Sequence, residues 1–218
     1  MQAVQRPVLV DVVGGEGALL WAKRAALVAF GVVLLALAAK VKVFMWPSPV
    51  PVTLGTFAVL SIGAAYGARL GLVTILGYMA VGAIGYDVFA SSSAERNGLE
   101  YMIGGTGGYL VGYVLAVAAL GYFARRGWDR NIALMALAML IGNALIYVPG
   151  VAWLHVLIES GNPLSGSAAL FNASTYESVW SQTMTWGLTP YLIGDGLKLA
   201  AAALIFPLIW RAVGDARA

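Results

Sequence analysis

The stretch that decides the fold is Trp186–Ile209, WGLTPYLIGDGLKLAAAALIFPLI. It is long enough to cross a bilayer as one helix, which takes about 20 mostly apolar residues. Yet it contains Asp195 and Lys198, which are three residues apart and would share a helix face. A charge at the centre of a spanning helix costs roughly 2.5–3.5 kcal/mol on insertion scales, so it usually faces a cavity or a partner. We therefore predict that this face lines a buried ligand site; the alternative is an ion pair that only orders helix packing.

The composition is that of a helical membrane protein. Of the 218 residues 61% are hydrophobic and 11% are charged, whereas soluble domains carry about 25% charged residues. Cysteine is absent and His155 is the single histidine, which argues against disulfides and against thiolate or histidine-rich metal centres. No basic stripe indicates nucleic-acid binding. We expect an all-α polytopic membrane protein that needs no metal or cofactor and has no nucleic-acid partner.

The apolar residues form six segments that could span a membrane. They are Leu19–Ala39, Leu54–Ala68, Leu70–Ala90, Gly105–Ala124, Ile132–Leu157 and Trp186–Ile209. The second and third are separated only by Arg69, so these two helices should be neighbours. The pattern predicts a bundle of six transmembrane helices in residues 18–210, between short tails at 1–17 and 211–218.

The basic residues predict the orientation. With the N-terminus in the cytoplasm, nine lie inside, three lie outside and Lys198 lies within the membrane, which accounts for all 13. The inner ones are Arg6, Lys23, Arg24, Arg69, Arg125, Arg126, Arg130, Arg211 and Arg217, and the outer ones are Lys40, Lys42 and Arg96. This asymmetry follows the positive-inside rule. Both termini are therefore predicted to be cytoplasmic.

Two further segments carry candidate binding residues. The glycine-rich run Gly104–Tyr109 allows close backbone approach, either to a ligand that meets Thr106 and Tyr109 or to a neighbouring helix. In the fifth segment, Asn143 and Tyr147 are four residues apart and share a face. An amide in a membrane helix often bonds a neighbouring helix, which is the alternative to a ligand contact here.

The first segment has a stripe of small residues that suits close helix contact. The stripe includes Ala22, Ala25, Ala26 and Ala29. Small residues let backbones approach closely where lipid provides no hydrophobic drive. The stripe is a candidate docking face for another protein, and internal packing is the alternative.

Motifs for bond-breaking chemistry are absent. No lysine is followed by Ser or Thr, so there is no Walker A motif and no ATP hydrolysis by that route. There is also no nucleophile elbow and no HExxH. Asp195 and Lys198 could form a proton relay, which leaves a carrier or channel as an alternative. We predict that the protein is not an enzyme.

Four ordered motifs resemble those of the BioY family. They are SPVPVT at Ser48–Thr53, GGTGGYLVGY at Gly104–Tyr113, GNALIYVPGVAWL at Gly142–Leu154 and PYLIGDGLK at Pro190–Lys198. Members of this family are the biotin-specific substrate-capture subunits (S components) of energy-coupling factor (ECF) transporters. The resemblance covers most of the chain, from about Ala25 to Pro207.

The resemblance implies a six-helix bundle that holds biotin near the outer surface of a prokaryotic plasma membrane. Lys198 is then the candidate counter-ion of the biotin carboxylate, and Asp195 would accept from the ureido group or orient Lys198. Thr106, Tyr109, Asn143 and Tyr147 are further candidate contacts.

Family members pair with a transmembrane coupling protein and two cytoplasmic ATPase subunits, which would dock on the alanine stripe. Two hypotheses compete with vitamin capture. One is a self-sufficient proton-coupled carrier or channel that uses Asp195 and Lys198. The other is a structural membrane subunit whose ion pair only orders helices.

Overall fold

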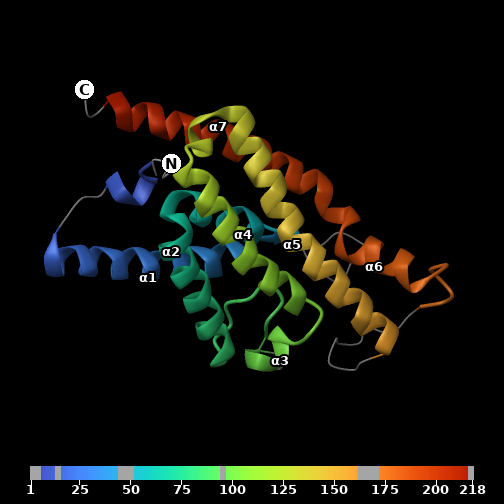
Figure 1. The fold of residues 1–218 in the computed structure, drawn as a ribbon. Helices are drawn as coiled ribbons and strands as arrows, with labels where there is room; N and C mark the ends of the chain where they lie inside the picture. The colour runs from blue at the N-terminus through green and yellow to red at the C-terminus, as the bar shows by residue number, and fades with distance from the viewer. Residues whose placement is uncertain (1–5, 13–15, 44–51, 94–96, 162–171, 216–218) are drawn as a thin grey trace, which may run out of the picture.

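The computed structural model describes residues 6–12, 16–43, 52–93, 97–161 and 172–215. Most of these residues are helical (Figure 1). The helices are α1 Gly17–Lys40, α2 Gly55–Ala83, α3 Gly98–Met102, α4 Gly107–Arg125, α5 Ile132–Ser160, α6 Val179–Gly187 and α7 Leu192–Asp215. Short 3-10 turns lie at η1 Leu9–Val12, η2 Trp128–Arg130 and η4 Thr189–Tyr191, and β1 Lys42–Val43 pairs antiparallel with β2 Val52–Thr53.

Five helical stretches are long and apolar enough to cross a membrane within the described ranges. They are Gly17–Lys40, Gly55–Ala83, Gly107–Arg125, Ile132–Ser160 and Val179–Gly214. The second is broken at Gly67, whose φ of +74° is one that glycine adopts readily. Its two arms correspond to the second and third predicted segments and point in different directions (Figure 1). At 1.5 Å per residue they are about 18 and 24 Å long, so neither alone crosses a hydrocarbon core of about 30 Å.

The third predicted segment ends too late. Helix α2 stops at Ala83, not at Ala90, and the chain turns through Gly85 with φ +102°. The loop then brings Phe89 back into the core, where its ring stacks on Tyr101 at 4.8 Å between centroids. Phe89 is 1% exposed. An apolar run that enters the core from a loop has the same composition as the end of a helix, which explains the error.

The last predicted segment is not one helix. Helix α6 ends at Gly187, Pro190 lies in the following 3-10 turn, and α7 begins only at Leu192. Proline lacks an N–H and cannot continue the helical hydrogen bonds, which favours a break here. The break places Asp195 in the first turn of α7, at the positive end of the helix dipole. At its other end, α7 continues past Ile209 to Asp215.

The N-terminal segment is packed rather than free. Val8 is fully buried in a core formed with residues of α2, α4, α5 and α7. The Arg6 N–H donates to the Arg125 carbonyl at 2.8 Å, and the Arg125 Nη1 donates to the Asp11 carboxylate at 2.6 Å. Residues 6–12 therefore belong to the bundle, although the sequence predicts a soluble tail there.

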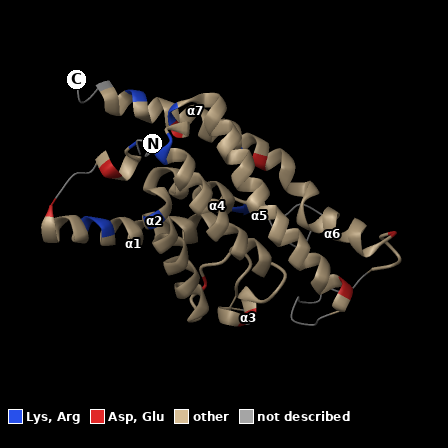
Figure 2. Cartoon of the chain, in the orientation of Figure 1, with Lys and Arg blue, Asp and Glu red and all other residues tan. Residues whose placement is uncertain are grey.

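Helix α4 packs between α2 and α5, and α7 runs along α5 (Figure 1). Helix α1 is different, because only 17% of its most apolar stretch is buried within the chain. The first and last described residues lie at the same end of the bundle, where Lys and Arg gather (Figure 2). This grouping matches the predicted inner side; the cytoplasmic location of the termini stays a prediction.

At this end, Asp129 in η2 is hydrogen-bonded to α7. We predict that its burial makes the stability of the fold depend on pH. Asp129 is 1% exposed and accepts from Trp210 Nε1 of α7. Burial raises the pKa of the Asp129 carboxyl to about 6. Because the folded pKa is raised above the unfolded value, the ionised form destabilises the fold, and stability increases as pH falls through 6.

Between pH 7.5 and 5 we expect a gain of about 1.4 kcal/mol, or about 3 °C in melting temperature. Asp129→Asn should lack this pH dependence. Thermal melts of both proteins at the two pH values measure the difference. Equal slopes for parent and variant would contradict the assignment.

Candidate functional site

A cavity of about 80 Å³ lies between the bundle and the loop that follows α2. Its walls come from α2, α3, α4, α5, α7, the end of α1 and the segments that join them. The polar lining residues are Thr53, Thr56, Thr106, Asp195 and Lys198. The aromatic ones are Tyr78, Phe89, Tyr101, Tyr109, Tyr113, Tyr147 and Tyr191. The cavity therefore combines one charged corner with a wall of rings.

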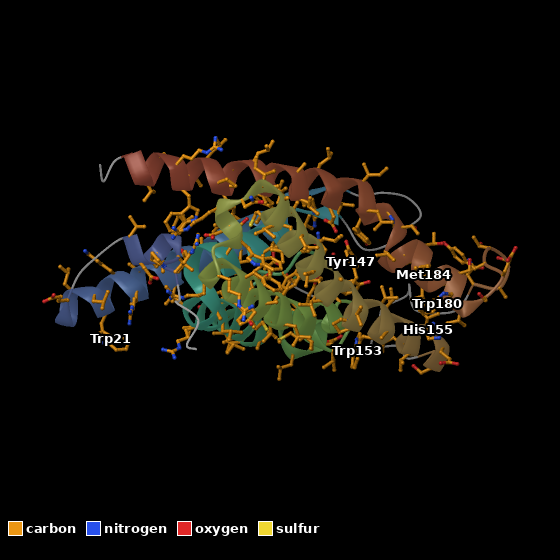
Figure 3. All side chains as sticks on the ribbon, turned by 45° about the horizontal axis from the view of Figure 1, so that its top comes forward. Trp21, Tyr147, Trp153, His155, Trp180 and Met184 are labelled. Carbon is orange, nitrogen blue, oxygen red and sulfur yellow. The ribbon has the colours of Figure 1, made fainter. Side chains whose placement is uncertain are left out.

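The charged corner is a network of four side chains. Lys198 Nζ donates to Asp195 Oδ1 at 2.9 Å and to Thr56 Oγ1 at 3.0 Å. The Tyr147 hydroxyl, which points from α5 towards α7 in Figure 3, donates to the other carboxylate oxygen of Asp195. The side chains of Lys198 and Asp195 are 12% and 7% exposed. A buried ion pair needs such extra hydrogen bonds, because its Coulomb attraction alone rarely offsets the cost of desolvation.

Within this network, Lys198 keeps one N–H donor that has no assigned acceptor. Asp195 accepts from Lys198, Thr56 and Tyr147, so both of its oxygens are engaged. An ammonium has three N–H donors, and the bonds to Asp195 and Thr56 use two of them. The third N–H of Lys198 can therefore donate to a bound molecule while the carboxylate keeps its counter-ion. The hydroxyl groups of Thr56 and Tyr147 also donate to Asp195 and stabilise its negative charge.

The aromatic wall is fixed by close helix packing. Tyr109 donates its hydroxyl to the Gly187 carbonyl at 2.8 Å and lies edge-on to Tyr147, with centroids 6.2 Å apart. A Cβ at Gly150 would lie 2.4 Å from the Tyr109 ring. Gly108 likewise meets α5, where a Cβ would approach the Pro149 carbonyl at 2.4 Å. The glycine-rich run thus serves helix packing, and this packing places Thr106 and Tyr109 at the cavity.

The loop that follows α2 lines the cavity and is tied to the end of α1. Lys40 Nζ donates to Asp87 at 2.6 Å and to Ser92 at 3.4 Å, and Ser92 also donates to Asp87 at 2.5 Å. The Lys40 ammonium holds the pKa of the Asp87 carboxyl below its usual range, with help from Ser92. We call Lys40, Asp87 and Ser92 the clasp. Two of its residues, Asp87 and Ser92, lie on either side of Phe89 and Ala90, which line the cavity.

Residues 9–215 match the family model described as the BioY family. This match covers nearly the whole chain. The chain belongs to the BioY family.

Curated BioY proteins resemble the chain over most of its length. A "Probable biotin transporter BioY" of Pyrococcus horikoshii is 31% identical over 186 residues, which cover 84% of this chain and 94% of that protein. The "Biotin transporter BioY" of Thermotoga maritima is 27% identical over 157 residues, covering 72% and 79%. BioY proteins are transporters and not enzymes.

A solved structure has the same fold. It is described as the S-component for biotin from an ECF-type ABC transporter, with a TM-score of 0.67 and 16% sequence identity. The match covers 90% of this chain and 95% of that one. The BioY fold is therefore shared at low sequence identity, and the assignment of this chain as a multi-pass membrane protein agrees with its apolar helices.

The structure brings together five of the six residues that the sequence singled out for the ligand. Lys198, Asp195, Tyr147, Thr106 and Tyr109 all line the cavity. Asn143 does not. It lies one turn from Tyr147 on α5 and is 8% exposed, so it packs within the bundle. Its spacing from Tyr147 predicted a shared face but not how far the cavity extends along that face.

Sequence reasoning missed several residues of the BioY cavity. Tyr191 lies inside the motif at Pro190–Lys198, and Thr56 closely follows the motif at Ser48–Thr53, so their positions gave a signal. Phe89 and Tyr101 gave none, because they reach the cavity through a loop and the five-residue helix α3. The motif at Ser48–Thr53 lies largely outside the described residues, and only its last two residues appear, in β2.

The alanine stripe is exposed. Ala22, Ala25, Ala26 and Ala29 are all on the open part of α1, so no other helix of the described chain covers them. Ala25 and Ala29 face a second groove between α1 and α2. Ala22 and Ala26 are not part of that groove.

Proposed function

We propose that this chain captures biotin at the outer face of a prokaryotic plasma membrane, as the S component of an ATP-driven ECF-type importer. The observation that carries the proposal is the charged corner of Lys198, Asp195, Thr56 and Tyr147 in an aromatic cavity. Proteins that resemble the chain along most of its length are named biotin transporters. Ligand sites of this kind combine apolar walls with a few well-placed polar groups.

The chemistry of biotin suits such a cavity. Biotin has an apolar bicycle and chain, a ureido group and a carboxylate. We assign the carboxylate to the remaining N–H of Lys198. Because the oxygens of Asp195 already accept from three groups, we assign Asp195 to orienting Lys198. Tyr109, Tyr147 and Thr106 would contact the rings and the ureido group, whereas Asn143 would support the packing of α5.

A titration calorimetry experiment tests the capture of biotin directly. The purified full chain in detergent should bind one biotin, and the complex should survive gel filtration. Lipoate, which has a similar chain and carboxylate but lacks the ureido ring, is the matched control ligand. Absence of any heat with biotin, from protein that melts cooperatively, would exclude vitamin capture and leave a structural subunit.

Binding of biotin needs a larger cavity, and we assign the widening to opening of the clasp. Ligand sites usually measure roughly 300–1,000 Å³, whereas this cavity has about 80 Å³. Lys40→Met removes the ammonium and keeps the side-chain length, so the loop with Phe89 should open more often. We expect biotin to dissociate about threefold faster, because exposed ion pairs contribute roughly 0.2–1 kcal/mol. Stopped-flow chase with unlabelled biotin measures the rate.

Lys23→Met is the control for the clasp, since Lys23 lies at the other end of α1. It should leave the dissociation rate unchanged. An unaltered rate in Lys40→Met as well would remove the clasp from the entry pathway.

We propose that uptake uses the coupling protein and two ATPase subunits that the family resemblance implies, and the lack of a Walker A motif in this chain fits that arrangement. The exposed alanines of α1 are the proposed docking face. Ala26→Leu adds bulk there, so we expect biotin affinity to change less than about twofold and uptake with the coupling proteins to fall about tenfold. Radiolabelled uptake by cells that express the complete transporter measures the effect. Leu197→Phe, on an exposed face of α7, is the control.

A proton-coupled carrier makes a different prediction. Liposomes that hold only this chain would then accumulate biotin when a proton gradient is applied. We expect no accumulation without the coupling proteins. Gradient-dependent uptake by the chain alone would favour the carrier over the ECF-type importer.

A further inference from the structure

One of the tyrosines around the cavity differs from the others. Six tyrosines line the cavity, and five of them are hydrogen-bonded through the hydroxyl group to other protein groups. These bonds join Tyr78 to the Val88 carbonyl, Tyr101 to the Ser91 N–H, Tyr109 to the Gly187 carbonyl, Tyr147 to the Asp195 carboxylate and Tyr191 to the Trp186 carbonyl. The sixth is Tyr113, whose hydroxyl has no hydrogen-bond partner among the residues that the structure describes. Because a tyrosine O–H usually finds a partner when it is buried, Tyr113 offers a free donor to a bound molecule.

Packing places the Tyr113 hydroxyl beside the charged corner. Tyr113 lies one turn along α4 from Tyr109, so the two share a helix face. Its ring packs against both hydrophobic cores of the bundle. A Cβ at Gly55 would lie 3.4 Å from the Tyr113 hydroxyl oxygen, so the lack of a side chain at Gly55 leaves room for the hydroxyl. Gly55 begins α2, and the next residue, Thr56, accepts from Lys198 in the charged corner.

The charged corner is electrically balanced before a ligand enters. Lys198 and Asp195 form an ion pair whose charges cancel. A carboxylate that binds Lys198 therefore brings a negative charge that this pair does not neutralise. The carboxylate has two oxygens, whereas Lys198 has one N–H left after its bonds to Asp195 and Thr56. A second donor is thus needed at the corner, where the N-terminus of α2, the positive end of the helix dipole, also favours an anion.

We propose that Tyr113 determines the specificity of this site for a free carboxylate. Its hydroxyl donates to one carboxylate oxygen while Lys198 donates to the other. Hydrogen bonds to an ionised oxygen are roughly twice as strong as those between neutral groups. The two donors together therefore favour the free acid over amide or ester conjugates of the same molecule. This inference rests on the proposed capture of biotin and adds to it a residue and a substrate class.

Tyr113→Phe tests the proposal, because it removes the hydroxyl and keeps the ring that packs against the cores. The variant should melt at the temperature of the parent, and its affinity for biotin should fall about tenfold through loss of a hydrogen bond to a charged group. A biotin analogue with a methyl group in place of the carboxyl group lacks the acceptor, so its affinity should change less than about twofold. Competition against radiolabelled biotin on the purified full chain measures both ligands. Tyr122→Phe, the same change at an exposed position of α4 outside the cavity, is the matched control and should leave both affinities unchanged.

A third ligand, 2-thiobiotin, tests the other end of the molecule. It carries sulfur in place of the ureido oxygen and keeps the carboxylate, so Tyr113→Phe should weaken its binding by the same factor as that of biotin. An unchanged affinity for biotin, or an equal loss for the methyl-ended analogue, would overturn the proposal. A smaller loss for 2-thiobiotin than for biotin would assign the hydroxyl to the ureido group and overturn it too. Failure of the parent itself to bind biotin would instead overturn the proposed capture, and this inference with it, so the two failures are distinguishable.

Discussion

Replacing Lys198 by alanine should weaken biotin binding by at least about 100-fold. The substitution removes the N–H that we assign to the biotin carboxylate and leaves Asp195 buried without its counter-ion. Breaking a buried ion pair in this way costs about 3–5 kcal/mol. Biotin amide lacks the negative charge, so its affinity should fall less than about fivefold. Parallel calorimetric titrations with the two ligands measure both effects.

A double variant separates the effect on binding from the effect on folding. The double variant Asp195→Asn, Lys198→Met has no unpaired buried charge, so it should fold as well as the parent and still bind biotin weakly. Thr56→Val removes only one neighbour of Lys198 and should reduce affinity by about tenfold or less. Equal losses for biotin and biotin amide in Lys198→Ala would show that the charged corner holds the ureido group or none of the ligand.

Replacing Gly121 by alanine should destabilise the bundle by about 3 kcal/mol. A Cβ at Gly121 would lie 2.0 Å from the Ala68 nitrogen and 2.5 Å from the Ala68 Cα. These are backbone atoms just beyond the break at Gly67, so no side chain can rotate away. Helices α2 and α4 would have to separate. Thermal unfolding in detergent, followed by tryptophan fluorescence, should show a large fall in melting temperature.

Gly196→Ala is the control for this experiment. A Cβ at Gly196 meets nothing within 4 Å on α7, so the change should be neutral or stabilise by up to about 1 kcal/mol through helix propensity. If both alanine variants melt at the temperature of the parent, α2 and α4 do not pack as closely at the break as the structure shows.

The membrane class and the family followed from the sequence because they depend on local patterns. Long apolar runs separated by polar turns predict spanning helices without knowledge of any tertiary contact. The pairing of Asp195 with Lys198 was also predictable, since residues three apart on a helix are neighbours. Helix ends were less predictable. The break at Pro190 and the early end of α2 at Ala83 both lie inside apolar stretches, where hydropathy does not change.

The amino-acid sequence by itself therefore determined that this is an α-helical membrane protein of the BioY family with a charged pair in its last span. Only the tertiary structure decided what surrounds that pair. Thr56 is 142 residues from Lys198, and Tyr147 is 48 residues from Asp195. Phe89 joins the same cavity from a loop, and Asn143 stays outside it. The physical reason is that periodicity specifies which face of a helix is buried, whereas helix breaks and close glycine contacts specify which faces meet.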